Sequence, residues 1–197
     1  MSLTGTTKPY HHGDLRNVLF KIGMDLLRQD GQGAVIMRAC AKIAGCAPSA
    51  VSRHYKDRKA LATALATEGF NLLGNRMTAA VETVDKDVQH RVAARTYIDF
   101  AMQEPHLFRL MFQGDLIDIE DPDLRAASEF LRNDAALANP TAPNQKDDEA
   151  VLAWAIVHGL ASLAIDSQLC RGLPSDPKQR TDALMRILDQ TASPFKD

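Results

Sequence analysis

The sequence lacks the features that mark secreted and membrane-spanning proteins. It holds three cysteines, Cys40, Cys46 and Cys170, an odd number without a CxxC spacing, so it predicts free thiols in a reducing cytoplasm. Its first residues carry no apolar segment of the kind found in signal peptides. The longest apolar run, residues 150–165, is shorter than the roughly 20 residues of a membrane span and contains His158. We therefore expect this run to form a buried helix in a cytoplasmic protein.

Motifs of catalysis and metal binding are missing as well. The sequence contains no GxSxG, HExxH or P-loop motif, no candidate pair of catalytic carboxylates and no Cys/His pair. His11 and His12 have no Cys or carboxylate at ligand spacing. The acidic segment 115–123 is more typical of a solvated loop than of a cation site. The sequence therefore predicts no enzyme, no cofactor and no metal.

Strand signals are nearly absent, while apolar residues at helical spacing are found along the whole chain. Asp14 and Asp57 stand where N-caps are expected, Gly45 where a helix stops, and Pro48 in the first turn of a helix. The sequence predicts an all-α fold of about nine helices, with residues 139–148 as a linker. The expected helices cover residues 14–29, 37–44, 48–54, 57–84, 90–103, 105–112, 124–137, 149–170 and 176–191.

The net charge of −2 conceals an asymmetry along the chain. Residues 1–60 carry ten Lys or Arg against four Asp, which gives +6. The rest of the chain carries 13 basic and 21 acidic side chains, which gives −8. A basic block followed by an acidic one suggests that the first block alone binds a polyanion. Chance segregation of charge is the alternative.

Residues 37–55 (MRACAKIAGCAPSAVSRHY) have the pattern of a helix-turn-helix. The first short helix buries Met37, Cys40 and Ala41 and ends at a glycine turn, and the second presents small and polar groups outward. Such a second helix reaches base edges in the major groove of DNA while the first braces it. An ordinary αα-hairpin with surface charges is the alternative. The polar and basic side chains that we expect at DNA are Arg38, Ser49, Ser52, Arg53, His54, Lys56, Arg58 and Lys59.

The segments YHHGDLR (residues 10–16) and AGCAPSAVSRHYKDRKAL (residues 44–61), with the long helix after them, closely resemble the DNA-binding domain of the TetR repressor family. Further on, PHLFRLMF (residues 105–112) and WAIVHGLASLAID (residues 154–166) look like a TetR subfamily marked by a Trp-x-x-x-His-Gly signature. The first resemblance covers about residues 10–65, and the later segments follow in the expected order.

This resemblance implies a helix-turn-helix domain in residues 1–60 and a helical ligand-binding and dimerisation domain in residues 61–197. It implies a homodimer that binds a palindromic DNA operator and responds to a small-molecule effector, without contact to a membrane. We expect a transcriptional repressor that a small apolar effector releases from DNA through the long fourth helix. A helical ligand-binding or protein-interaction module with a decayed DNA-binding surface is the alternative. Three departures from the family pattern favour that alternative: Ile36, Ala47 and Ser52.

A ligand pocket is expected among the later helices, because large flexible apolar residues are frequent there. Trp154 and His158 lie four residues apart and share a helix face. A plain core with a hydrogen-bonded histidine is the alternative for this pair. No buried Lys or Arg is foreseen in the pocket, so a neutral or cationic effector is favoured over a strongly anionic one. The expected pocket residues are Met102, Phe108, Met111, Phe112, Phe130, Trp154 and His158.

The last two helices are expected to form the dimer interface, as the resemblance implies. Residues 150–165 are apolar on more than one face, so this helix needs cover from its own subunit and from a partner. Gly159 is expected to permit the close approach of another helix, within the subunit or across the dimer. The interface residues expected from this pattern are Leu160, Ala161, Ala164, Leu184 and Leu188.

Overall fold

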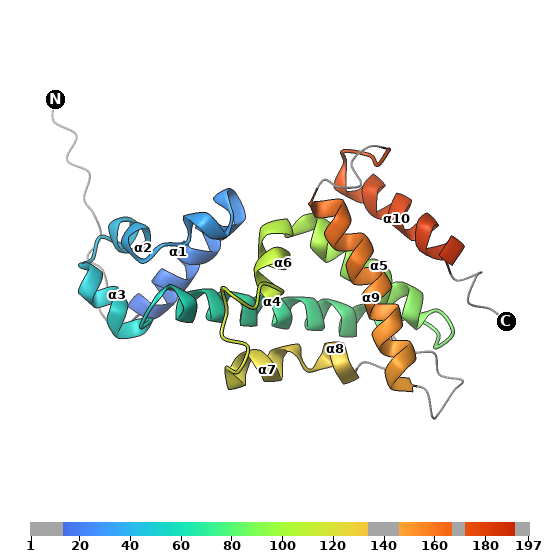
Figure 1. Cartoon of the computed structure of the whole chain (residues 1–197), viewed down its shortest axis with the longest axis horizontal. Coiled ribbons are helices and arrows are strands. Elements are labelled where there is room, and N and C mark those ends of the chain that lie inside the picture. The colour runs from blue at the N-terminus through green and yellow to red at the C-terminus, as the bar shows by residue number, and fades with distance from the viewer. Residues whose placement is uncertain (1–13, 134–145, 167–171, 192–197) are drawn as a thin grey trace.

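The computed structural model describes residues 14–133, 146–166 and 172–191, and within these ranges the chain is all helical (Figure 1). Cys170, His11 and His12 lie outside the described residues. The all-α prediction is confirmed. The helices are α1 (Leu15–Asp30), the short 3-10 helix η1 (Gln32–Ala34), α2 (Met37–Ala44), α3 (Pro48–His54), α4 (Arg58–Val81), α5 (Gln89–Gln103), α6 (Pro105–Met111), α7 (Pro122–Ser128), α8 (Phe130–Asn133), α9 (Lys146–Ile165) and α10 (Pro177–Thr191).

Most helix ends lie where the local sequence signals placed them. The bounds of α2 and α3 agree with the prediction, because Gly45 ends α2 in the left-handed region (φ 65°) and Pro48 opens α3. The carboxylate of Asp57 caps α4 by accepting a hydrogen bond from the backbone N–H of Ala60 at 2.8 Å. Asp14 precedes α1 as expected, but its carboxylate accepts from the Asn17 amide and from no backbone N–H.

Three expectations on the elements need correction. The 3-10 turn η1 is an addition that the sequence patterns did not indicate. The expected seventh helix is divided into α7 and α8, with Glu129 between them. The α9 helix begins at Lys146, so residues 146–148 belong to a helix and not to the expected linker, whose other residues lie outside the described part.

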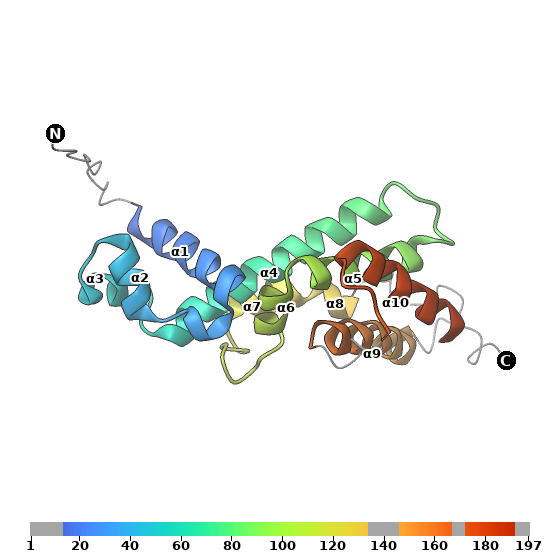
Figure 2. The ribbon, with the colours of Figure 1, turned by 90° about the horizontal axis from the view of Figure 1, so that it is seen from above.

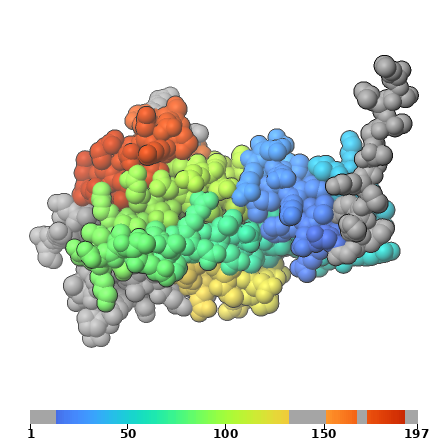
Figure 3. Space-filling model, turned by 180° about the vertical axis from the view of Figure 1, so that it is seen from behind, coloured from blue at the N-terminus to red at the C-terminus, as the bar shows by residue number. Residues whose placement is uncertain are grey.

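The long helix α4 is the axis of the molecule (Figures 1 and 2). Its first turns pack against α1, and its later turns against α5, α6 and α7. Seen from behind, α4 and α5 occupy the centre, with α1 at one end and α7 along one edge (Figure 3). The α6 helix crosses α4 closely, since a Cβ atom at Gly69 would lie 2.7 Å from Sδ of Met111 and 3.1 Å from a methyl group of Leu107.

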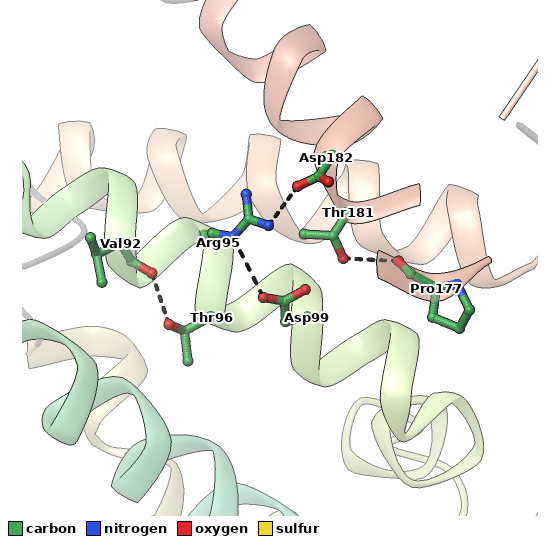
Figure 4. Close-up of polar contacts among 7 residues, drawn as sticks. All are labelled: Val92, Arg95, Thr96, Asp99, Pro177, Thr181 and Asp182. Atoms are coloured by element: carbon green, nitrogen blue, oxygen red, sulfur yellow. Dashed lines mark hydrogen bonds and ion pairs between the residues drawn. The ribbon is translucent and has the colours of Figure 1, made fainter. Parts of the chain in front are cut away.

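The C-terminal helix α10 packs on α5, and ion pairs bridge the two helices. The guanidinium of Arg95 lies between Asp99 of its own helix, at 3.8 Å, and Asp182 of α10, at 2.5 Å (Figure 4). That contact lowers the pKa of the Asp182 carboxyl below its usual range. Arg91 and Asp189 form a second ion pair between α5 and α10. These contacts place α10 against its own subunit.

Candidate DNA interface and ligand site

The helix-turn-helix is built by apolar residues on the inner sides of α2 and α3. Cys40, Val51 and Tyr55 are buried, and the guanidinium of Arg16 on α1 lies 5.6 Å from the ring centre of Tyr55. The backbone N–H of Cys46 donates to the carbonyl of Ala41 at 3.0 Å, which closes the turn between the two helices. Burial also raises the pKa of the Cys40 thiol, as expected for an inert structural cysteine.

The opposite side of α3 is open to solvent. Ser49, Ser52, Arg53 and His54 are all exposed on it. The Ser52 hydroxyl donates to the Pro48 carbonyl of its own helix at 3.4 Å. Neither Ile36 nor Ala47, the residues that precede α2 and α3, supplies a side-chain cap, as the sequence indicated. Three further predicted residues are exposed beside this surface: Arg38, Lys56 and Lys59.

Arg58 differs from the other predicted DNA contacts. Its side chain is half-buried, and its Nε and Nη2 atoms donate to the carbonyl oxygens of Val35 at 2.8 Å and of Gln32 at 2.6 Å. A guanidinium held in this way braces the segment between α1 and α2 against the start of α4. Arg58 therefore has a structural role, and its expected contact with DNA stays a prediction.

A groove of about 520 Å³ runs beside the exposed end of α3. One side carries Arg53 and Lys56, and the other carries Asp118, Asp121 and Asp123 of the segment before and at the start of α7. The acidic segment is thus a wall of the same groove. No group of three or more His, Cys, Asp or Glu side chains among the described residues is placed to hold a metal ion.

The loop that carries these acids is anchored to α4. The backbone N–H of Asp118 donates to Oγ1 of the buried Thr63 at 2.9 Å, and the same hydroxyl donates to the carbonyl of Lys59 at 2.8 Å. The position of this loop is therefore tied to the first turns of α4, directly after the helix-turn-helix.

Four of the seven predicted pocket residues form one aromatic cluster. Phe108 on α6 and Phe112 directly after it contact His158 on α9, with ring centres 5.5 and 4.5 Å from that of His158, and the Trp154 ring centre lies 5.6 Å from that of His158. The cluster has a buried fifth member, Tyr97 on α5, whose ring centre lies 5.4 Å from that of Phe108. Tyr97 was not among the predicted residues, because nothing in the local sequence distinguishes it from a core residue.

Hydrogen bonds run through this cluster. The indole N–H of Trp154 donates to the Tyr97 oxygen at 3.3 Å, and the Tyr97 hydroxyl is hydrogen-bonded to Nδ1 of His158 at 2.8 Å. Nε2 of His158 lies 3.2 Å from the hydroxyl of Ser162. Burial lowers the pKa of His158 and raises that of Tyr97, so both are neutral near pH 7.

The other three predicted pocket residues lie elsewhere around α4 or in the core. Met111 packs on α4 at Gly69, and the ring of Phe130 on α8 packs on α4 at Gly74, where a Cβ atom would lie 3.2 Å from it. Met102 is buried near the end of α5.

The expected dimer residues are divided between the core and its edge. Ala161, Ala164 and Leu184 are buried within the single chain, so they have no surface to offer to a partner, and this part of the prediction is corrected. Leu160 and Leu188 are partly buried against the same core. The outer side of α9 and α10 instead exposes Val151, Leu152, Leu163 and Ile187.

A comparison with protein families gives one match. The model described as "Tetracyclin repressor-like, C-terminal domain" matches residues 90–188, which is half of the chain. The chain belongs to the TetR-like family of transcriptional regulators. The match spans α5 to α10, the part of the regulator that contains the aromatic cluster and the exposed side of α9.

Solved structures similar to the regulator cover nearly its whole length. A protein of unknown function from Rhodococcus sp. RHA1 shares 29% identity at a TM-score of 0.67, over 91% of this chain and 98% of that one. A bacterial regulatory protein in the TetR family from Rhodococcus RHA1 shares 19% identity at a TM-score of 0.56, over 88% and 96%. A TetR-family transcriptional regulator from Bordetella parapertussis 12822 shares 12% at a TM-score of 0.56, over 89% and 94%. No curated protein matches the chain.

Because the last two identities are low, these structures support the fold of the regulator and not its ligand or its operator. Their coverage includes the helix-turn-helix end as well as the family-matched half. Within the residues that the structure describes, no helix combines the length and the apolar character needed to cross a membrane.

Proposed function

We propose that this regulator is a repressor that binds a palindromic DNA operator as a homodimer and leaves it when a small apolar effector binds. The observation that carries the DNA-binding part is the exposed side of α3. Ser49, Arg53 and His54 lie there, while Val51 and Tyr55 on the other side are buried. A short helix that is fixed on one side and polar on the other suits the major groove.

Arg53 and His54 are assigned to base or phosphate contacts, and Lys56 and Lys59 to the phosphate backbone. Arg38 on α2 reaches the backbone beside them, and Ser49 and Ser52 keep the helix close to the groove floor. In this proposal residues 1–60 form the DNA-binding domain and residues 61–197 the ligand-binding and dimerisation domain. The regulator acts in the cytoplasm, where it has access to DNA, and it has no catalytic role, because the sequence carries no catalytic motif.

The homodimer is proposed to form through the outer sides of α9 and α10. Leu152, Ala155, Gly159 and Leu163 recur at intervals of three and four residues, so they share one side of α9. A Cβ atom at Gly159 would meet no other atom of the described residues within 4 Å. The small residue therefore leaves room for a helix that the single chain does not supply. Exposed apolar residues of this size on two neighbouring helices are typical of a subunit interface.

The effector is proposed to bind at the aromatic cluster around His158. Trp154, His158 and Gly159 form the Trp-x-x-x-His-Gly signature, which supports the assignment to that TetR subfamily. The cluster members are aromatic rings with a few hydroxyl and ring nitrogen groups, and none of them is a Lys or Arg. A strongly anionic effector would have no counter-charge there, so a neutral or cationic apolar molecule is favoured.

The α6 helix is placed to carry the signal. Phe108 on α6 and Phe112 directly after it belong to the cluster, and Glu104 directly before α6 accepts two hydrogen bonds of 2.9 Å from Arg28 on α1. His106 lies against Gly31 at the end of α1. A shift of α6 on effector binding would move α1 directly, in addition to the route through α4.

Trp154 is the single tryptophan of the chain and reports on the site by its fluorescence. The experiment titrates neutral, cationic and anionic apolar compounds and follows Trp154 emission and release of a DNA fragment from the region upstream of the gene. Neutral or cationic compounds are expected to change the emission and to release the DNA. Phe112→Ala, which enlarges the site beside Trp154, is expected to change the response. If only anionic compounds act, or if Phe112→Ala responds as the wild type does, the effector proposal is wrong.

A further inference from the structure

A second pocket lies away from the aromatic cluster, at the junction between the helix-turn-helix and the rest of the chain. Its volume is about 210 Å³. Val35, before α2, and Ala62, on α4, form one side, and Leu110 and Leu116, at the end of α6 and after it, form the other. Val35, Ala62 and Leu110 are buried, so apolar side chains line the inner part of the pocket.

Charged groups of both signs surround the mouth of this pocket. Lys59 and Asp115 both line it and are both exposed. Among the described residues neither side chain takes part in an ion pair. Arg58 is the third charged lining residue, and two of its nitrogens are already used by the carbonyls of Gln32 and Val35. Those bonds hold the Arg58 side chain in one wall of the pocket. Because carbonyl groups are uncharged, they do not neutralise the positive charge of Arg58.

The size of the pocket limits what it can hold. Its 210 Å³ is about seven times the ~30 Å³ that one water occupies in the liquid. It is smaller than the ~300–1,000 Å³ of sites for drug-sized ligands. A molecule with a short aliphatic body therefore suits the apolar interior.

We propose that this pocket binds a small aliphatic α-amino acid. The side chain enters between Val35, Ala62 and Leu110, the carboxylate meets Lys59, and the ammonium group meets Asp115. A zwitterion supplies a partner for both exposed charges at the mouth, Lys59 and Asp115, and its carboxylate also suits the additional positive charge of Arg58. An aliphatic side chain of three or four carbons fills the interior.

The pocket walls come from both parts of the chain, so an occupied pocket holds the start of α4 and the loop after α6 at one distance. Binding there would stabilise one arrangement of the helix-turn-helix relative to the ligand-binding part. This consequence rests on the proposed DNA-binding function. The binding itself does not, and it is measured without DNA.

The test is isothermal titration calorimetry of the full chain with L-leucine and two matched analogues. One is 4-methylpentanoate, which lacks the amine, and the other is 3-methylbutylamine, which lacks the carboxylate. L-leucine is expected to bind at least about tenfold more tightly than either analogue, because each analogue leaves one charged partner unused. No heat with L-leucine at millimolar concentration would overturn the proposal. Equal binding of 4-methylpentanoate would overturn the zwitterion assignment.

Variants of the lining residues separate the contacts. Asp115→Asn is expected to weaken L-leucine about tenfold and to leave 4-methylpentanoate unchanged, whereas Lys59→Gln should weaken both and spare 3-methylbutylamine. Ala62→Leu fills the interior and should abolish binding of all three compounds. Asp115→Asn replaces an exposed side chain and is expected to fold, so it tests the proposal even if Ala62→Leu does not fold. Lys86→Gln, a matched exposed lysine in the segment between α4 and α5, should bind as the wild type does. Unchanged L-leucine binding by Asp115→Asn and Lys59→Gln would contradict the proposal.

Discussion

At the scale of single residues, neighbouring arginines with the same charge have different roles. Arg53 is exposed on α3, while Arg58, five residues later, is half-buried and bonded to two backbone carbonyls. The sequence shows two basic residues near a helix-turn-helix and does not show which of them turns inward. The difference arises because the segment from Gln32 to Val35 leaves carbonyl groups facing α4, and a guanidinium has the reach and the geometry to satisfy both.

This difference predicts that two matched substitutions affect different properties, stability in one case and DNA binding in the other. Arg58→Ala is expected to lower the free energy of unfolding by about 1–3 kcal/mol, since two carbonyls lose a charged donor. Arg53→Ala is expected to change the free energy of unfolding by less than about 0.5 kcal/mol, as is usual at exposed sites, and to weaken DNA binding. Urea unfolding of both variants measures the first effect. Equal stability of Arg58→Ala and the wild type would show that the two hydrogen bonds contribute nothing.

His158 predicts a pH dependence of stability. Burial lowers its pKa in the folded protein, so below the ordinary value of about 6.5 the unfolded chain takes up a proton that the folded one resists. The contribution of neutral His158 to the free energy of unfolding is therefore fully present above that pH. It decreases as the pH drops toward the lowered pKa, by up to about 1.4 kcal/mol per pH unit. The His158→Asn variant should lack this component. The measurement is the difference in unfolding free energy between wild type and variant from pH 7.5 to 5, and a constant difference would contradict the prediction.

At the scale of elements, local chemistry predicted the bounds of the helices better than the contacts between helices. Gly45, Pro48 and Asp57 act within one turn of their own backbone, so the bounds of α2, α3 and the start of α4 followed from the sequence. The split between α7 and α8 has no such signal.

Tertiary contacts also decide which sides of α9 and α10 are covered. Ala161 and Leu184 were assigned to a dimer interface because these helices are apolar on several sides, and periodicity alone does not tell which side the same chain covers. Tyr97 was missed for the same reason, since its partners lie some 60 residues away in the sequence.

The α6 helix gives a prediction about coupling. Glu104→Gln removes the charge that pairs with Arg28 and should reduce the coupling free energy between effector and DNA by about 0.5–2 kcal/mol, with effector affinity unchanged. Glu120→Gln is the matched control, because Glu120 pairs with Arg125 on the exposed start of α7, away from α1. The measurement is the DNA affinity of each variant with and without effector. Equal coupling in both variants would exclude α6 from the route.

At the scale of the whole molecule, the exposed side of α9 predicts a dimer. Leu163→Glu and Leu152→Glu place a charge in the proposed interface and should shift the protein to monomers. Ile119→Glu is the control, since Ile119 is equally apolar and 57% exposed but lies in the loop before α7. Light scattering at micromolar concentration gives the mass of each. A wild-type monomer, or a dimer that tolerates both substitutions, would contradict the proposed interface.

The central claim is that the regulator binds duplex DNA through the exposed side of α3 and its basic neighbours. The most direct measurement is the affinity for a palindromic fragment from upstream of the gene, against a scrambled fragment, over a range of salt concentrations. The logarithm of the binding constant should fall steeply with the logarithm of salt concentration, by about 0.9 per phosphate contact. Lys56→Ala should reduce that slope by about 2 in a symmetric dimer, one contact per subunit. Arg53→Ala should weaken the palindrome more than the scrambled DNA. Absence of binding at low salt, or equal affinity for both fragments at every salt concentration, would contradict the account and favour a helical module whose DNA-binding surface has decayed.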